Sequence, residues 1–156
     1  MRFLNSFVLA AGCIAGAACA QPVPGGFSLG MSAAQLQQAD PALARVAHPA
    51  RLAGGLVGNW SGSAVQLAGV SLTPTFFFAE GELRRVEYLA RDGSAASYAA
   101  LLAWGRGAWG QELASNAPEG AYASWDAPDV QAYLQHTGAQ VRLVTKKRTL
   151  KDASEL

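Results

Sequence analysis

Apolar and polar residues alternate most regularly near the end of the chain, where they predict a β-hairpin. The expected strands are residues 129–136 and 139–147, and Thr137-Gly138 fits a two-residue turn between them. In this register Tyr133 lies opposite Arg142 on a polar side of the hairpin. The other side is apolar and carries Val130, Ala132, Leu134, Val141 and Leu143. Such a hairpin is typical of an antiparallel sheet that is covered on one face.

A second hairpin is predicted in the middle of the chain. Residues 75–78 and 83–89 are rich in aromatic and aliphatic side chains, and Ala79-Glu80-Gly81 fits a three-residue loop with glycine at a left-handed position. That loop would place four side chains on one face, namely Phe76, Phe78, Val86 and Tyr88. Another strand-like stretch of Val and Leu residues precedes this hairpin at residues 65–72.

A first helix is predicted after residue 31. Ser32 and Gln35 form a capping box, and Met31 and Leu36 are placed as a hydrophobic staple across the helix start. Pro41 ends or kinks this helix because proline cannot donate the backbone hydrogen bond of a helical residue.

A second helix is expected from Ser94 to Leu113. Apolar positions recur there at intervals of three and four residues, at Tyr98, Leu101, Leu102, Gly105, Trp109 and Leu113. Trp104 falls outside this stripe, which leaves open either burial at the edge of the core or exposure as a contact for a partner. Three glycines in the second half each lower the helix propensity by about 1 kcal/mol relative to alanine and predict irregularity there.

Together these elements predict an α+β fold in which two helical regions pack on an antiparallel sheet. A short internal sequence repeat, the tryptophan echo, adds the hypothesis that a unit of a helix followed by strands is duplicated. Trp60 is followed by Val65-Gln66, and Trp125 is followed by Val130-Gln131 at the same spacing.

The first twenty residues have the features of a removable secretion signal. Arg2 supplies a positive start, the segment Phe7–Ala18 is apolar and uncharged, and Ala18-Cys19-Ala20 has the small residues that a signal peptidase accepts. The expected organisation is a cleaved signal peptide at 1–20, an extended Pro/Gly-rich lead-in at 21–30, a single α+β domain at 31–150 and a C-terminal tail at 151–156.

The leader predicts export, with the periplasm as the location. Cys13 and Cys19 both lie within it, so cleavage after Ala20 would leave a domain without thiols. Ala10-Ala11-Gly12-Cys13 loosely resembles a lipoprotein signal, and an outer-membrane lipoprotein anchored at Cys13 is the alternative. No transmembrane segment is expected after cleavage, since a helix needs about 20 apolar residues to span a bilayer.

The charge of the chain argues against nucleic-acid binding. Lys and Arg number 12 against 11 Asp and Glu, and loss of Arg2 with the leader would bring the net charge to zero, whereas binding to phosphates draws on a positive excess. The glycine-rich stretch 54–62 lacks the lysine of a phosphate-binding loop, and close backbone approach explains it better. A solvated strand end, or else a contact with anionic lipid, explains the basic cluster of Lys146, Lys147, Arg148 and Lys151.

The sequence contains no pattern that points to a catalytic or metal site. His48 and His136 have no metal-ligand spacing, and we expect both to be exposed. Ser61 lies in a segment that lacks the first glycine of a hydrolase nucleophile elbow. We therefore predict a protein without catalytic residues, cofactor or metal. The candidate partner contacts are Trp104, Tyr133 and Arg142.

Phe27-Ser28-Leu29-Gly30-Met31-Ser32 leads into the predicted first helix, and Phe76-x-Phe78-x-x-Gly81-x-Leu83-x-x-Val86 spans the predicted hairpin. These two motifs resemble the Gly-Met-Thr helix start and the hairpin of the SmpA/BamE-type envelope domains, which are related to the β-lactamase-inhibitor fold. The resemblance implies a small exported bacterial domain with a non-enzymatic role.

These observations lead to one functional expectation and two alternatives. We expect a periplasmic or envelope-associated module that binds another envelope or secreted protein. The first alternative is an inhibitor of a secreted enzyme, such as a lysozyme or a β-lactamase, that uses a hairpin tip as a plug. The second is an enzyme of unrecognised type. A deep pocket lined by convergent polar groups would favour that last alternative.

Overall fold

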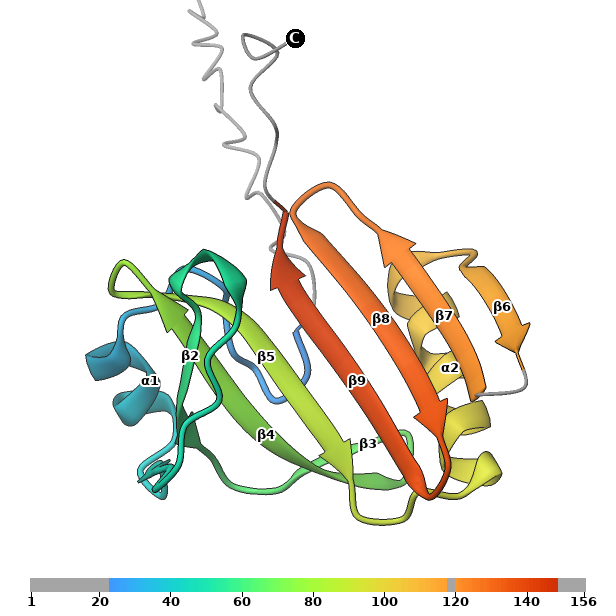
Figure 1. The fold of residues 1–156 in the computed structure, drawn as a ribbon, viewed down its shortest axis with the longest axis horizontal. Helices are drawn as coiled ribbons and strands as arrows, with labels where there is room; N and C mark the ends of the chain where they lie inside the picture. The colour runs from blue at the N-terminus through green and yellow to red at the C-terminus, as the bar shows by residue number, and fades with distance from the viewer. Residues whose placement is uncertain (1–22, 118–119, 149–156) are drawn as a thin grey trace, which may run out of the picture.

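The computed structural model of the chain describes residues 23–117 and 120–148, so the predicted leader with Cys13 and the tail at 151–156 lie outside the described residues. Within the described ranges, nine strands form one antiparallel sheet, accompanied by two α-helices and a 3-10 turn (Figure 1). In chain order the elements are α1 (Ala33–Ala39), β1 (Ala44–Arg45), η1 (Ala53–Gly55), β2 (Val57–Ser61), β3 (Val65–Leu67), β4 (Val70–Ala79), β5 (Glu82–Ala90), α2 (Ala95–Trp109), β6 (Leu113–Ala117), β7 (Gly120–Asp126), β8 (Val130–Thr137) and β9 (Gln140–Lys147).

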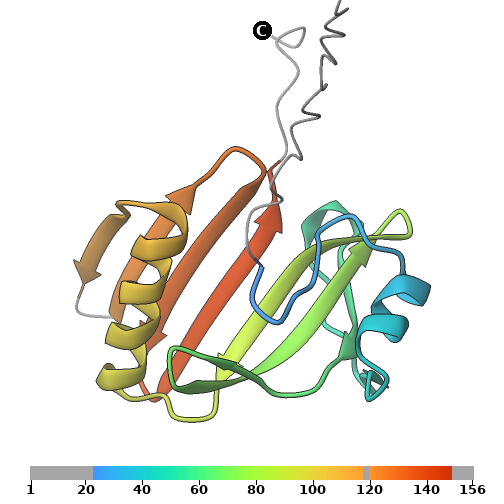
Figure 2. The same ribbon diagram turned by 180° about the vertical axis from the view of Figure 1, so that it is seen from behind.

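Strands β5 and β9 pair at the centre of the sheet. The strand order is β1-β2-β4-β5-β9-β8-β7-β6, and β3 pairs with β4 outside this path. Each of the two long hairpins, β4–β5 and β8–β9, therefore contributes one strand to the central pair. Figure 2 shows α2 lying along one face of the C-terminal strands, while α1 lies at the other end of the sheet.

The predicted fold class, an α+β arrangement built on two helical regions, is wrong. The described chain is mostly antiparallel sheet, and its helices have only 7 and 15 residues. Sequence reasoning assigned no element to residues 114–128, where Ala, Ser and Gly give no apolar alternation, yet β6 and β7 form there through backbone pairing with each other and with β8. The tryptophan echo does not mark equivalent strands either, since Val65 lies in β3, off the main path, whereas Val130 begins β8.

The main core lies between α2 and the sheet face that α2 covers. Leu101 of α2 and Leu134 and Leu143 of the β8–β9 hairpin are fully buried there. Gly105 of α2 lies against the indole of Trp125, and a β-carbon at this position would be 2.6 Å from a ring carbon. Glycine therefore lets the helix approach the sheet closely enough to cover the tryptophan.

The lead-in expected at 21–30 packs against the same face of the sheet from residue 23 onward. Val23 and Phe27 are buried, and the Phe27 ring meets the Phe76 ring edge-on at 4.8 Å between centroids. The Tyr88 hydroxyl donates a hydrogen bond of 2.7 Å to the carbonyl oxygen of Pro24. Burial raises the pKa of Tyr88, so this hydroxyl stays protonated and remains a donor at physiological pH.

Helix α1 begins as predicted and ends at Ala39, two residues before Pro41, with Asp40 as its C-cap. The capping box of Ser32 and Gln35 is confirmed in both directions. Asp40 ends the helix and accepts hydrogen bonds from the backbone and hydroxyl of Ser63 at 2.7 and 2.9 Å and from the Ala42 N–H at 3.1 Å. Burial acts to raise the pKa of Asp40, but these hydrogen bonds outweigh it and hold the pKa below its ordinary value.

The β4–β5 hairpin has the predicted face but a shorter loop. Its four expected core residues are all buried: Phe76, Phe78, Val86 and Tyr88. Ala79 pairs with Glu82, so the loop contains only Glu80 and Gly81, at φ 54° and 79°. The extra residue expected in the loop is instead Arg84 in β5. Phe77 pairs with Arg85 and Phe78 pairs with Leu83, so Arg84 has no partner in β4 and forms a bulge.

The β8–β9 hairpin is also confirmed, with its pairing shifted by two residues. Thr137 pairs with Gln140, so the turn consists of Gly138-Ala139, and Tyr133 lies opposite Val144 instead of Arg142. Because side chains alternate with a period of two along a strand, this shift leaves each one on its predicted face.

Helix α2 ends earlier than expected. It stops at Trp109 because Gly110 adopts φ 88°, and Leu113, a residue that is 79% exposed, begins β6. The chain thus turns sharply after the glycine-containing end of α2 and enters the strand at the edge of the sheet.

Candidate functional site

The sheet face opposite α2 carries the candidate site. Across β5, β9, β8 and β7, no helix of the described chain covers this face, which is turned toward the viewer in Figure 1. The pairing of Arg85 with Lys146, and of Glu87 and Tyr133 with Val144, places their side chains together on it. We call this surface the open face and define it by Arg85, Glu87, Tyr122, Tyr133, Arg142, Val144 and Lys146.

Arg85 lies on β5, the outermost strand of the open face, and joins two strands that are not neighbours. Its Nε and Nη2 atoms donate to Oε1 of Glu87 at 2.9 and 2.6 Å, and Nη2 also donates to the Tyr133 hydroxyl across β9. The side chains of Arg85 and Glu87 are only 15% and 19% exposed. The ion pair is therefore held in one geometry by packing.

Aromatic rings extend this arrangement on both sides of Arg85. Its guanidinium carbon lies 5.8 Å from the ring centre of Phe77 and 5.5 Å from that of Tyr133. Tyr133 in turn stacks on Tyr122 with 5.8 Å between ring centres. Val144, which lies between Glu87 and Tyr133 in the pairing, is fully buried beneath these side chains. The open face thus has a packed aromatic and arginine layer of its own.

The structure brings two of the three predicted partner contacts together and separates the third. Tyr133 and Arg142 both lie on the open face, where Arg142 Nη1 is 3.9 Å from Oε2 of Glu87. Trp104 belongs to α2, on the other side of the sheet, and its ring meets Trp109 edge-on at 4.8 Å. Trp104 is partly buried, packed against the core.

Sequence reasoning missed Arg85, Glu87 and Tyr122 as members of this surface. The signal was present in β5, where Arg85 and Glu87 alternate with the core residues Val86 and Tyr88. Charges at positions i and i+2 of a strand with an apolar opposite face lie side by side on the outer face. That pattern could have placed the pair, although not its contact with Tyr133.

No protein-family model, curated protein or solved structure matches this chain. The resemblance to SmpA/BamE-type domains therefore stays a prediction. In the described part of the chain, neither helix combines the length and the apolar character needed to cross a bilayer.

The two histidines do not belong to the open face and have different surroundings. His48 is exposed, as expected. His136 is half-buried instead of exposed: its Nε2 lies 3.1 Å from the carbonyl oxygen of Gly93, and its ring stacks on Tyr98 at 5.8 Å. These contacts give His136 a role in joining β8 to the loop before α2. Among the described residues, no three His, Cys, Asp or Glu side chains converge as metal ligands would.

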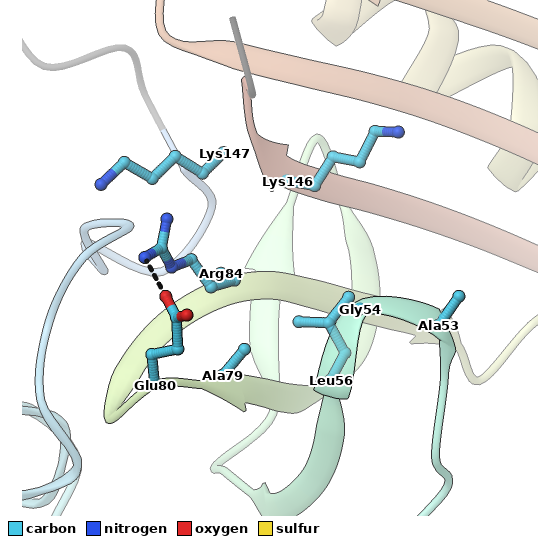
Figure 3. Close-up of a pocket in the computed structure, with 8 residues that line it drawn as sticks. All are labelled: Ala53, Gly54, Leu56, Ala79, Glu80, Arg84, Lys146 and Lys147. Carbon is cyan, nitrogen blue, oxygen red and sulfur yellow. Dashed lines mark hydrogen bonds and ion pairs between the residues drawn. The ribbon is translucent and has the colours of Figure 1, made fainter. Parts of the chain in front are cut away.

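A hollow of about 370 Å³ lies beside the β4–β5 loop (Figure 3) and contains part of the basic cluster. Its lining residues are Ala53, Gly54, Leu56, Ala79, Glu80, Arg84, Lys146 and Lys147. Arg84 is held by Glu80 and Glu82 at 3.3 and 3.2 Å, and Figure 3 shows that Lys146 and Lys147 leave β9 in opposite directions. The cations do not converge on one point, so the hollow lacks the geometry of an anion site.

Proposed function

We propose that this protein is an exported, non-enzymatic interaction module that binds another envelope or secreted protein through the open face. Export is part of the proposal because residues 1–20 have the pattern of a secretion signal. The single observation that supports binding is the row of Arg85, Tyr133 and Tyr122 on a sheet face without a covering helix in the described chain.

The chemistry of this row suits protein recognition. Tyrosine and arginine are enriched among the residues that dominate binding energy at protein interfaces. Because Arg85 is fixed by Glu87 and Tyr133, and Tyr133 by Tyr122, these side chains would lose little conformational freedom on binding. The hollows on the open face are shallow and of about 200 and 210 Å³, which fits single side chains of a partner better than a buried small molecule.

Site-specific photo-crosslinking in the native host tests this proposal. A photoreactive phenylalanine analogue would replace Gln135, which is exposed on the open face, and a matched control would carry it at Gln37, which is exposed on α1. We expect one discrete protein adduct from position 135 in the periplasmic or membrane fraction and none from position 37. Equal adducts from both positions, or a protein found only in the cytoplasm, would contradict the proposal.

The same experiment distinguishes the alternative of an enzyme inhibitor. An inhibitor that inserts a hairpin tip would crosslink from Glu80, which has an 84% exposed side chain at the β4–β5 loop, more strongly than from Gln135. We expect the reverse order, because the row of aromatic and arginine side chains lies on the strands and not at the loop.

A further inference from the structure

Two cations on β9 lie on the open face on either side of Tyr133. Arg142 pairs with Gln135 and Lys146 pairs with Gln131, while Val144 between them pairs with Tyr133. Same-face residues repeat about every 6.7 Å along a strand, so the backbone positions of Arg142 and Lys146 are about 13 Å apart. Tyr133 stands midway between the two cations.

Each cation also lines a hollow on the open face. Lys146 lines a hollow of about 200 Å³ that includes the rings of Tyr122 and Tyr133. Arg142 lines another of about 210 Å³ together with Gln135, Thr137 and Gln140. The open face therefore presents two shallow depressions with a tyrosine between them, and each depression contains one basic side chain.

Positive charge remains at both depressions after the internal ion pairs are formed. Glu87 is bound by Arg85 at 2.6 Å and lies 3.9 Å from Arg142, whose side chain is 41% exposed. Lys146 forms no ion pair with any described residue. Asp126 also lines the Lys146 depression, but its carboxylate pairs with Arg148 at 3.3 Å. An incoming carboxylate would thus meet a net positive charge at either end.

We propose that the open face docks an extended segment of a partner protein with two acidic side chains four positions apart and an aromatic or aliphatic side chain midway between them. An extended segment that runs along β9 repeats its own same-face side chains at the spacing of β9, so the two carboxylates reach Arg142 and Lys146 together. The central side chain then lies on Tyr133. This inference rests on the proposed function, because it names the chemistry of the partner for the same surface.

Defined peptides test this charge pattern on the full chain. The probe is an acetylated and amidated peptide with the core Glu-Ser-Tyr-Ser-Glu, and its control has Lys-Ser-Tyr-Ser-Lys. Backbone and side-chain NMR shifts of the labelled protein would report the site and the affinity. We expect the acidic peptide to move signals of Arg142, Lys146, Tyr133 and Tyr122, and the shifts to vanish at about 1 M salt, where the screening length is only about 3 Å.

Substitutions on one strand separate the docking site from the general charge of the protein. Arg142→Gln and Lys146→Gln should each weaken binding of the acidic peptide by about fivefold, the upper range for an exposed ion pair. Lys147→Gln is the matched control, because Lys147 points away from the open face and pairs with Glu82 at 3.6 Å. The double variant R142E/K146E should prefer the lysine peptide.

Three results would overturn this inference: no shift with the acidic peptide at millimolar concentration, equal binding of both peptides, or equal weakening by Lys147→Gln. None of them would affect the crosslinking test at Gln135, so the proposed function would survive if its adduct still formed. Failure of both experiments would remove the open face as an interaction surface altogether.

Discussion

The guanidinium of Arg85 in β5 donates a hydrogen bond to the hydroxyl of Tyr133 in β8, passing over the intervening strand β9. The two residues are 48 positions apart in sequence and belong to different hairpins. This contact joins the hairpins on the open face, while the apolar core joins them on the other face. The surface proposed to bind a partner is therefore also a structural link between the two halves of the sheet.

Tyr133→Phe should reduce the free energy of unfolding by about 1 kcal/mol, the net value of a typical hydrogen bond. The phenylalanine ring keeps the stacking on Tyr122 but leaves Arg85 without one acceptor. Tyr122→Phe is the control, because the Tyr122 hydroxyl makes no hydrogen bond with a described residue, and it should change stability little. Urea denaturation measures both, and an equal loss in the two variants would show that the Arg85 contact contributes nothing.

Leu134→Asp should prevent folding, because the substitution places a carboxylate in a fully buried apolar site. Leu134→Ala gives a measurable counterpart and should cost about 2–5 kcal/mol through the cavity it leaves. Gln135→Asp, at the next and exposed position, should stay within about 0.5 kcal/mol of the parent. Circular dichroism on heating distinguishes the three, and a parental melting temperature for Leu134→Asp would contradict the assigned face.

The ion pair of Arg106 and Glu112 should make stability depend on pH in the acid range. Arg106 donates hydrogen bonds of 2.8 and 2.5 Å from Nε and Nη2 to the carboxylate of Glu112. These bonds lower the pKa of Glu112 from 4.5 to about 2. A lowered folded-state pKa gives stability that is present above pH 4.5 and is lost as the pH falls toward 2.

Glu112→Gln should therefore be less stable than the parent at pH 6, and the difference should shrink as the pH falls from 4.5 to about 2. Urea midpoints measured along this pH series provide the comparison. A difference between Glu112→Gln and the parent that stays constant down to pH 2 would refute the assignment.

Two glycines of α2 should respond in opposite ways to replacement by alanine. Gly107→Ala adds a β-carbon with nothing within 4 Å and should stabilise the protein by about 1 kcal/mol through helix propensity. Gly105→Ala would place its β-carbon 2.6 Å from the Trp125 ring and should destabilise by about 1–3 kcal/mol. Melting temperatures of the two variants give the sign directly, and stabilisation by both would mean that the helix does not approach Trp125 this closely.

Local sequence patterns predicted the elements whose signal is contained within a few residues. The capping box of Ser32 and Gln35 needs only one helical turn, and it formed as expected. The apolar faces of both long hairpins were also predicted, because alternation along a strand assigns each side chain to a face whatever the pairing. The pairing itself was wrong by two residues in β8–β9, and the β4–β5 loop was one residue too long.

The remaining errors of prediction concern backbone pairing that leaves no pattern in the side chains. β7 is a strand because its backbone bonds to the edge of β8, and β6 is a strand because its backbone bonds to β7. The Ala and Ser residues of these segments therefore could not predict them. The candidate contacts Tyr133 and Arg142 were found because they lie on the polar side of a hairpin, whereas Trp104 was separated from them once α2 packed on the opposite face.

Local patterns were enough to predict the apolar side of each long strand, the start of α1 and the glycines near the end of α2. The pairing of β5 with β9, which brings Arg85 to Tyr133, arises only when the two long hairpins pack together. Faces and caps depend on residues a few positions apart, whereas strand order depends on which distant hairpins bury their apolar faces together.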